Sequence, residues 1–92
     1  MILVITDNRV KDREAYMPLA KAFVKDTWSD YGCHSMELCA DPDKADRVVF
    51  VSKWSSKEDF MAHVQGSTFA KHIPGMAPYY VSGTDTFLDI AE

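Results

Sequence analysis

The sequence predicts an α+β fold of the ferredoxin-like βαββαβ type, in which helices cover one face of an antiparallel sheet. Four short segments rich in β-branched and aromatic residues predict strands. Two segments between them repeat apolar residues at three- and four-residue spacings and predict helices. Their order along the chain is strand, helix, strand, strand, helix, strand. A chain of 92 residues without internal repeats or a linker is expected to form a single domain, 1–92.

The segment Arg47–Trp54 predicts the strand around which the other elements are arranged. Val48 and Phe50 point to one side of this strand, and Val49 and Val51 point to the other. A strand that is apolar on both sides is covered on both faces. Because the helix that follows covers only one face, we expect a partner subunit to cover the other.

A helix is expected directly after this strand. Ser55 and Glu58 have the spacing of a capping box, in which each side chain accepts a hydrogen bond from a backbone N–H at the helix start. Phe60 and Val64 are four residues apart and share one helical face. Gly66 is a typical helix stop.

The remaining elements are predicted by the same patterns. Pro18 lies early in the first helix, so this helix either begins later than Asp12 or bends in its first two turns. In chain order, we expect a strand at Ile2–Val10, a helix from Asp12 to about Asp30, a strand at Cys33–Ala40, a turn at Asp41–Asp46, a short helical turn at Ser67–His72, an irregular segment at Ile73–Pro78 and a last strand at Tyr79–Ile90.

Charge and hydropathy exclude several classes of protein. Lysine and arginine residues are scattered in a chain of net charge −4, which argues against a nucleic-acid partner. No apolar run approaches the roughly 18 residues of a membrane span. The apolar start, Met1 to Ile5, is too short for a signal peptide and has no basic leader, so we expect a cytoplasmic protein.

Two cysteines, Cys33 and Cys39, lie on one predicted strand. At about 3.3 Å per residue they share a face but are separated by roughly 20 Å, whereas a disulfide needs Cα atoms within about 7 Å. We expect two free thiols, as is typical of a reducing compartment. Without a closely spaced cysteine pair, a zinc site is not expected.

A few polar and aromatic residues are candidates for a site. His63 precedes the core residue Val64 and lies either at a helix boundary or beside a cavity between helix and sheet; His72 has the same two interpretations. Asn8 is polar on an otherwise apolar side of its strand, as either a strand-end hydrogen bonder or a pocket donor. Trp54 is either a core or a site residue. No nucleotide, metal or flavin motif is present, so no cofactor is indicated.

Several fragments together resemble the antibiotic biosynthesis monooxygenase family, also called the dimeric α/β-barrel family, over nearly the whole chain. The stretch that begins Gly-Cys-His and the Ala-His pair look similar to quinol monooxygenases within that family. The fragments are Gly32–Leu38, Asp41-Pro42, Arg47–Trp54, Ser55 with Glu58, Ala62-His63-Val64, Ser67 and Phe69.

The resemblance implies a homodimer whose two sheets face each other, with a pocket between sheet and helices in each subunit. It also implies oxygenation of small aromatic, phenolic or quinol substrates by O₂ without metal or flavin, because the substrate anion supplies the electrons. His63 would be the base or anion stabiliser and Asn8 would assist it. The substrate would be bound by Trp54, Phe60, His72 and Phe69.

Departures from the family's patterns leave two alternatives. Phe50 and Phe60 stand where anthrone-oxidising members carry asparagine and tyrosine. Haem-degrading relatives use an early asparagine, matched by Asn8, but His63 stands at their tryptophan position and His72 is one residue from their haem ligand. A haem-binding or haem-degrading protein is one alternative. A non-catalytic dimeric ligand binder or stress-response protein is the other.

Overall fold

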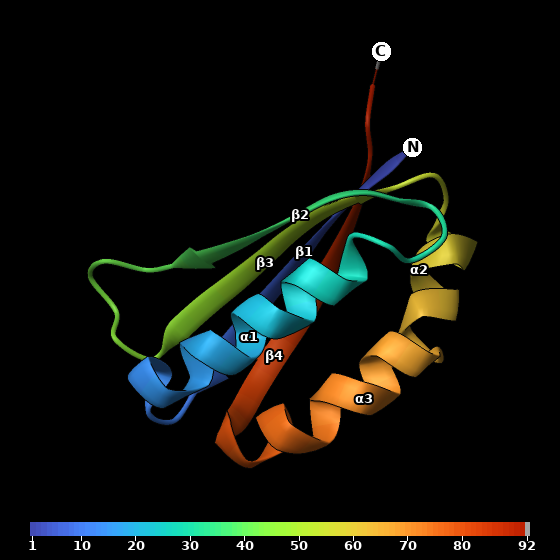
Figure 1. Ribbon diagram of the computed structural model, residues 1–92. Coiled ribbons are helices and arrows are strands. Elements are labelled where there is room, and N and C mark those ends of the chain that lie inside the picture. Colours follow the sequence, from blue (N-terminus) through green and yellow to red (C-terminus); the bar gives the residue numbers. More distant parts are fainter. Residues whose placement is uncertain (92) are drawn as a thin grey trace.

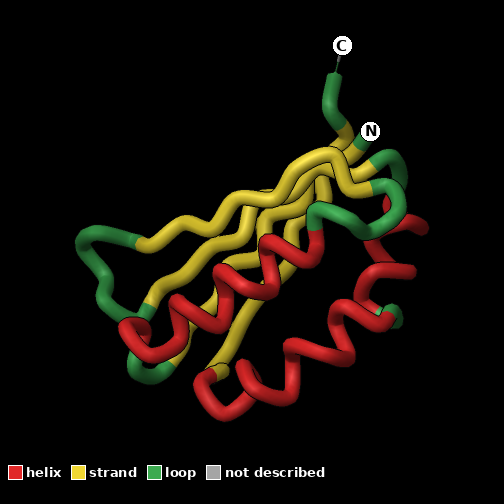
Figure 2. The backbone as a smooth tube through the Cα atoms, viewed as in Figure 1, coloured by secondary structure: helices red, strands yellow, loops and turns green. Residues whose placement is uncertain are grey.

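In the computed structural model, which describes residues 1–91 and leaves Glu92 outside, four strands form one antiparallel sheet in the order β2-β3-β1-β4. The helices lie together on one side of this sheet (Figures 1 and 2). The elements are β1 (Ile2–Val10), α1 (Arg13–Thr27), β2 (Cys33–Ala40), β3 (Arg47–Trp54), α2 (Lys57–Val64), α3 (Ser67–Met76), a 3₁₀ turn η1 (Ala77–Tyr79) and β4 (Tyr80–Asp89). The predicted ferredoxin-like α+β fold is confirmed.

Strand β3 has the two-sided apolar pattern that its sequence predicts. Val48, Phe50 and Trp54 are buried on the side that faces the helices, and they form part of one continuous core with α1 and α2. Val49 and Val51 lie on the other side and remain half-exposed in the single chain. The sheet therefore carries an uncovered face with apolar residues at its centre.

Helix α1 begins at Arg13, directly after Asp12. Asp12 adopts a left-handed backbone conformation with φ 46°, and its side chain accepts a hydrogen bond from the backbone N–H of Ala15 at 3.2 Å. This cap satisfies one of the free N–H groups at the helix start. Pro18 lies inside the helix and does not delay its beginning.

The start of α2 differs from the predicted capping box. Ser56, not Ser55, is the N-cap, and its hydroxyl accepts from the backbone N–H of Asp59 at 3.2 Å. Ser55 belongs instead to the end of the sheet: its N–H donates to the carbonyl of Gly32 at 2.8 Å, and its hydroxyl is bonded to the ring of His34. The predicted N-cap was one residue too early because the polar groups of Ser55 form hydrogen bonds with Gly32 and His34 instead.

Helix α3 is longer than predicted. It runs to Met76, through Pro74 and Gly75, and continues into η1, so the expected irregular segment at residues 73–78 is wrong. Met76 is buried in the core and Ile73 packs against it. Tertiary packing of this apolar face outweighs the local helix-breaking tendency of proline and glycine.

An irregularity at the start of β2 separates the two thiols. The pairing of β2 with β3 shifts between Cys33 and Ser35, so that Cys33 pairs with Trp54 on the helix side while Cys39 pairs with Val49 on the open side. The expectation that the cysteines share a face is therefore wrong, because the shift changes the side to which Cys33 points. Both cysteines are free, as expected.

Candidate functional site

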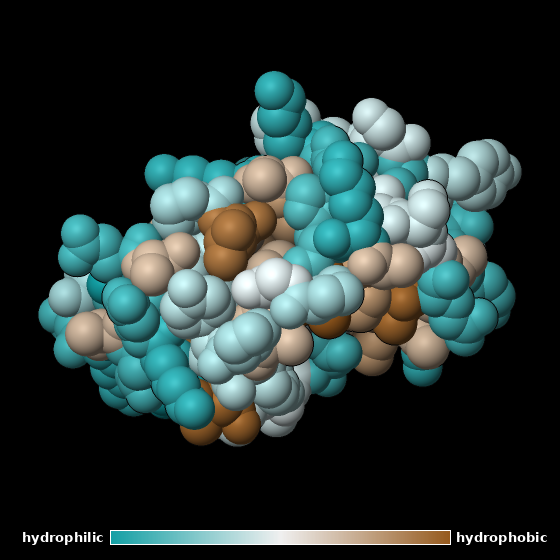
Figure 3. Space-filling model, turned by 60° about the horizontal axis from the view of Figure 1, so that its bottom comes forward, coloured by the Kyte–Doolittle hydropathy of each residue, from teal (hydrophilic) through white to brown (hydrophobic). Residues whose placement is uncertain are grey.

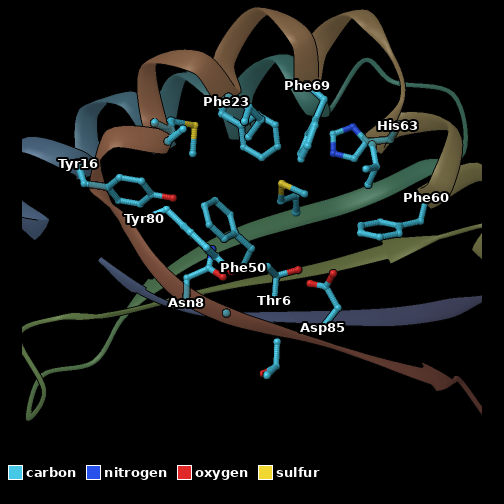
Figure 4. Close-up of a pocket in the computed structure, with 17 residues that line it drawn as sticks. Thr6, Asn8, Tyr16, Phe23, Phe50, Phe60, His63, Phe69, Tyr80 and Asp85 are labelled. Carbon is cyan, nitrogen blue, oxygen red and sulfur yellow. The ribbon is translucent and has the colours of Figure 1, made fainter. Parts of the chain in front are cut away.

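A cavity of about 400 Å³ lies between the sheet and the helices (Figure 4). The residues of β4 that border it are exposed, so the cavity opens beside this edge strand. Figure 3 turns the bottom of the Figure 1 view towards the reader and shows apolar residues in hollows between hydrophilic ones. The lining is mainly aromatic and aliphatic, with a few polar groups, and consists of Thr6, Asn8, Tyr16, Phe23, Met36, Phe50, Phe60, His63, Val64, Phe69, Ile73, Met76, Ala77, Tyr80, Gly83, Thr84 and Asp85.

The His63 side chain extends from α2 to the cavity, and its orientation is fixed by Asp30 on the side away from the cavity. Its residue is 5% exposed, and its Nδ1 lies 2.5 Å from Oδ2 of Asp30, in the loop after α1. The other oxygen of Asp30 accepts a hydrogen bond from the Thr68 hydroxyl at 2.6 Å. Because Asp30 engages Nδ1, the nitrogen left to act on a ligand is Nε2.

Aromatic rings surround the His63 imidazole. The ring centroids of Trp54 and Phe69 lie 4.9 Å and 5.7 Å from it, and that of Phe60 lies 6.0 Å away. Trp54 is completely buried and stands behind His63, outside the cavity lining. Its indole N–H is a buried polar group without a hydrogen-bond partner among the described residues. The imidazole is thus fixed in an apolar setting.

A second polar group lies at the Asn8 end of the cavity. Tyr16 is 3% exposed, and its hydroxyl lies near the Asn8 side chain. Burial raises the pKa of Tyr16 to about 12, so its hydroxyl stays neutral at physiological pH. A Cβ atom on Gly83 would come 2.2 Å from Oδ1 of Asn8 and 3.0 Å from the hydroxyl of Tyr80. Only glycine leaves room for this cluster.

The structure brings four of the six predicted site residues together. His63, Asn8, Phe60 and Phe69 line the cavity. Trp54 does not, as described above. His72 is also absent from the lining: its Nε2 lies 2.5 Å from Oδ2 of Asp26, near the end of α1. That hydrogen bond is the main reason why the pKa of Asp26 is lowered.

Other residues of the site were not among the sequence candidates. Asp30 and Thr68 support His63, and Tyr16 lies near Asn8. Asp85 places a carboxylate on the β4 wall of the cavity. Asn8, as a polar residue on an otherwise apolar side of its strand, was a candidate pocket donor, but no spacing in the sequence connects Asp30 to a histidine 33 residues later.

The site offers few groups that could bind a metal ion or haem. Among the described residues, no three His, Cys, Asp or Glu side chains are grouped so that they could hold a metal ion. The lining includes neither lysine nor arginine to pair with haem propionates, so the cavity is a poor match for haem. No helix within residues 1–91 is long and apolar enough to cross a membrane.

Comparison with known proteins identifies the family. The antibiotic biosynthesis monooxygenase profile matches residues 1–74. A crystal structure of an antibiotic biosynthesis monooxygenase has a TM-score of 0.88 at 21% identity, with complete coverage of both chains. Rv0793 from Mycobacterium tuberculosis has a TM-score of 0.83 at 18% identity, with 99% of this chain and 95% of that chain covered.

PA3566 from Pseudomonas aeruginosa has a TM-score of 0.86 at 15% identity, with 99% of this chain and 94% of that chain covered. At these identities the solved structures support the fold alone. No curated protein matches the sequence significantly. The family assignment comes from the sequence profile, which covers most of the chain. The chain therefore belongs to the antibiotic biosynthesis monooxygenase family.

Proposed function

We propose that the protein is a cofactor-independent monooxygenase that oxidises small phenolic or quinol substrates with O₂. The observation that carries this proposal is the His63 imidazole on the wall of an aromatic cavity, with its Nδ1 atom hydrogen-bonded to Asp30. Family membership supports monooxygenase chemistry in general. The aromatic side chains in the lining support an aromatic substrate. The volume of about 400 Å³ lies within the usual range of small-molecule sites.

In the proposed reaction, His63 acts as a general base. A substrate hydroxyl gives its proton to Nε2, and the resulting imidazolium is stabilised by the carboxylate of Asp30 at Nδ1. The electron-rich substrate anion then passes electrons to O₂. One oxygen atom enters the ring and the other leaves as water, so a quinol and O₂ give a hydroxyquinone and water. No external reductant is needed.

The cavity walls would contribute by excluding water. Phe60 and Phe69 stand beside His63, and both belong to the lining. An aromatic substrate that fills this space displaces solvent and brings its hydroxyl to the imidazole in a medium of low dielectric constant, where charged groups interact more strongly. Asn8, which lines the cavity, would donate a hydrogen bond from its side-chain amide to an oxygen of the substrate.

The direct test is His63→Ala with a quinol that the wild-type protein oxidises. Oxygen consumption should show kcat/KM reduced by about 10²-fold or more, the usual scale for loss of a general base. His34→Ala is the matched control, because His34 is exposed and bonded to Ser55 away from the cavity. Equal and small effects of the two substitutions would refute the role of His63.

Two further measurements separate the alternatives. Addition of haemin to the purified protein should give no sharp Soret band, because the lining has no cation for the propionates. A strong Soret band would favour the haem-binding alternative. Tight binding of quinols without any oxygen consumption across a panel would favour the non-catalytic ligand binder.

The proposed functional unit is a homodimer formed through the open face of the sheet. The apolar residues on that face include Leu3 and Ile5 of β1, Val49 and Val51 of β3, and the exposed Leu88 of β4. Successive side chains of a strand point to opposite faces, so these residues share the face that the helices leave open. A second copy packed face to face would remove these side chains from water.

A further inference from the structure

Asp85 is a single carboxylate on the wall of an otherwise uncharged, largely aromatic cavity. It lies on β4, directly opposite Thr6 of β1, and both residues belong to the lining. Figure 4 shows its carboxylate pointing into the cavity, on the opposite wall from His63. Within residues 1–91, Asp85 has no salt bridge. The nearby Lys57 ammonium lies over the Phe87 ring instead, 4.7 Å from its centroid.

The charge of the lining limits the ligands that it can take. Asp85 contributes a negative charge, and neither lysine nor arginine is present in the lining to balance it. A ligand with a carboxylate or phosphate would bring a like charge next to Asp85 at the open edge of the cavity. A ligand with a hydrogen-bond donor at the same position would be bound by a charged acceptor, which makes stronger hydrogen bonds than a neutral one.

Two of the hydrogen-bond acceptors in the lining lie on opposite walls of the cavity. One is the Nε2 atom of His63, since Nδ1 is engaged by Asp30, and the other is the carboxylate of Asp85. Among residues 1–91, neither acceptor has a protein hydrogen bond that a ligand must displace. An aromatic ring with two hydroxyl groups would satisfy both acceptors, whereas a ring with one hydroxyl would satisfy only one.

We propose that Asp85 is a specificity-determining residue that selects uncharged aromatic diols over aromatic acids and over aromatics with a single hydroxyl. The proposal rests on the proposed oxidation of quinols and names the group that binds the second hydroxyl. Conversion of a diol to a quinone releases two electrons and two protons. Insertion of one oxygen atom into a ring C–H bond, which gives the hydroxyquinone, supplies two further electrons, so that O₂ receives four electrons in all. One hydroxyl proton goes to His63 and the other to Asp85, both leave with the second oxygen atom as water, and the ring hydrogen becomes the hydroxyl hydrogen of the product.

The test measures ligand binding without O₂, so that no turnover occurs. Three probes share one scaffold: a para-naphthalenediol, its monomethyl ether, and the hydroxynaphthoic acid in which a carboxylate replaces one hydroxyl. The wild-type protein should bind the diol about tenfold more tightly than the ether, the size expected when one hydrogen bond to a charged group is lost. Asp85→Ala should abolish that preference.

A second variant keeps the shape of the side chain and removes its charge. Asp85→Asn should bind the naphthoic acid about tenfold more tightly than the wild-type protein does, because the like charge is gone. Asp89→Asn is the control: Asp89 is an exposed carboxylate on the same strand, outside the lining, and its substitution should change none of the three affinities.

The outcomes distinguish this proposal from the proposed function. The role of Asp85 would be overturned if Asp85→Ala still preferred the diol to the ether as the wild-type protein does. It would also be overturned if Asp85→Asn and Asp89→Asn changed the affinity for the naphthoic acid equally. If His63→Ala abolishes quinol oxidation in the same preparations, the proposed function stands while this inference fails. If His63→Ala oxidises quinols normally but Asp85→Ala loses the diol preference, the selectivity stands and the base is misassigned.

Discussion

The Nδ1 atom of His63 lies 2.5 Å from Oδ2 of Asp30, although the two residues are 33 positions apart. A carboxylate only accepts hydrogen bonds, so Nδ1 carries the hydrogen of this bond, and in the neutral imidazole Nε2 is then the acceptor. Asp30→Asn would offer an N–H₂ group to Nδ1 and favour the opposite tautomer. We expect kcat/KM for an active quinol to fall by about 10²-fold, as when the orienting carboxylate of a catalytic histidine is lost.

Asp26→Asn is the matched control for Asp30→Asn. Asp26 also clamps the end of α1 to a histidine, since it lies 2.5 Å from Nε2 of His72, but this pair is outside the cavity lining. Each variant loses a hydrogen bond between the end of α1 and a histidine. Only Asp30→Asn should lose more activity than its loss of folded protein explains. Parallel losses in activity and melting temperature for both would make Asp30 a structural residue.

The sequence predicted one side of this pair and not the other. Helical periodicity places His63 next to Val64, and the family resemblance directs it to the pocket, where it lies. Asp30 follows the end of α1 in a loop, and no local pattern reports which distant side chain a loop carboxylate will meet. Contacts between remote segments are set by packing of the whole chain, which a reading of local patterns does not include.

The same reason explains the errors in the secondary structure. The four strands and the two main helices were predicted close to their bounds because periodicity is a local property. The extent of α3 was missed because packing of Ile73 and Met76 against the core outweighs Pro74 and Gly75. The cap of α2 was displaced by one residue because Ser55 bonds to Gly32 and His34.

Gly83→Ala should disturb the Asn8 end of the cavity while the fold is retained. The added Cβ would lie 2.2 Å from Oδ1 of Asn8 and 3.0 Å from the hydroxyl of Tyr80, so both side chains must move. We expect weaker quinol binding and a kcat/KM close to that of Asn8→Ala. Binding titrations and oxygen consumption check this expectation.

Gly75→Ala is the control for that substitution. Gly75 lies in α3, and a Cβ there would meet no atom within 4 Å. Alanine is favoured over glycine in helices, so this variant should gain about 0.5–1 kcal/mol in the free energy of unfolding with unchanged activity. Unchanged binding in Gly83→Ala as well would show that the Asn8 cluster does not contact the ligand.

Assembly through the open face of the sheet predicts a stable homodimer. Its interface should exceed the roughly 1,200 Å² lower bound of standard interfaces. Val51→Lys would place a charge at the centre of this face and should shift the protein towards monomer in light scattering. Leu19→Lys, at an exposed position of α1, is the control and should leave the mass unchanged. A wild-type monomer at micromolar concentration would contradict the prediction.

The thiols of Cys33 and Cys39 should both titrate in denatured, unreduced protein. They are free, and the shift at the start of β2 turns them to opposite faces of the sheet. Burial raises the pKa of the Cys33 thiol, which lowers the fraction of reactive thiolate. In native protein Cys33 should therefore react with a thiol reagent more slowly than glutathione does. An internal bridge in the mass spectrum would contradict the assigned strand.

Arg47 links two carboxylates at the end of the sheet and should make stability depend on acid pH. Its guanidinium donates to Asp7 through Nε at 3.1 Å and Nη2 at 2.7 Å, and to Asp41 through Nη1 at 3.1 Å. The hydrogen bond from Arg47 is the main reason why the pKa of Asp7 is lowered from 3.8. The pKa of Asp41 is also lowered, mainly by a hydrogen bond from the backbone N–H of Asp43 and next by the hydrogen bond from Arg47.

A carboxylate whose pKa is lower in the folded state stabilises the fold above its unfolded pKa and loses that contribution as pH falls through its folded pKa. Asp7→Asn should therefore have a lower melting temperature than the wild-type protein at pH values above about 4, where unfolded aspartate is ionised. The difference should shrink as the pH falls below that value, because the wild-type Asp7 becomes protonated too. Asp43→Asn, whose side chain has no salt bridge within residues 1–91, should follow the wild-type curve. A difference between Asp7→Asn and wild type that stays constant down to pH values well below 4 would mean that the asparagine acts through packing rather than through loss of the charge.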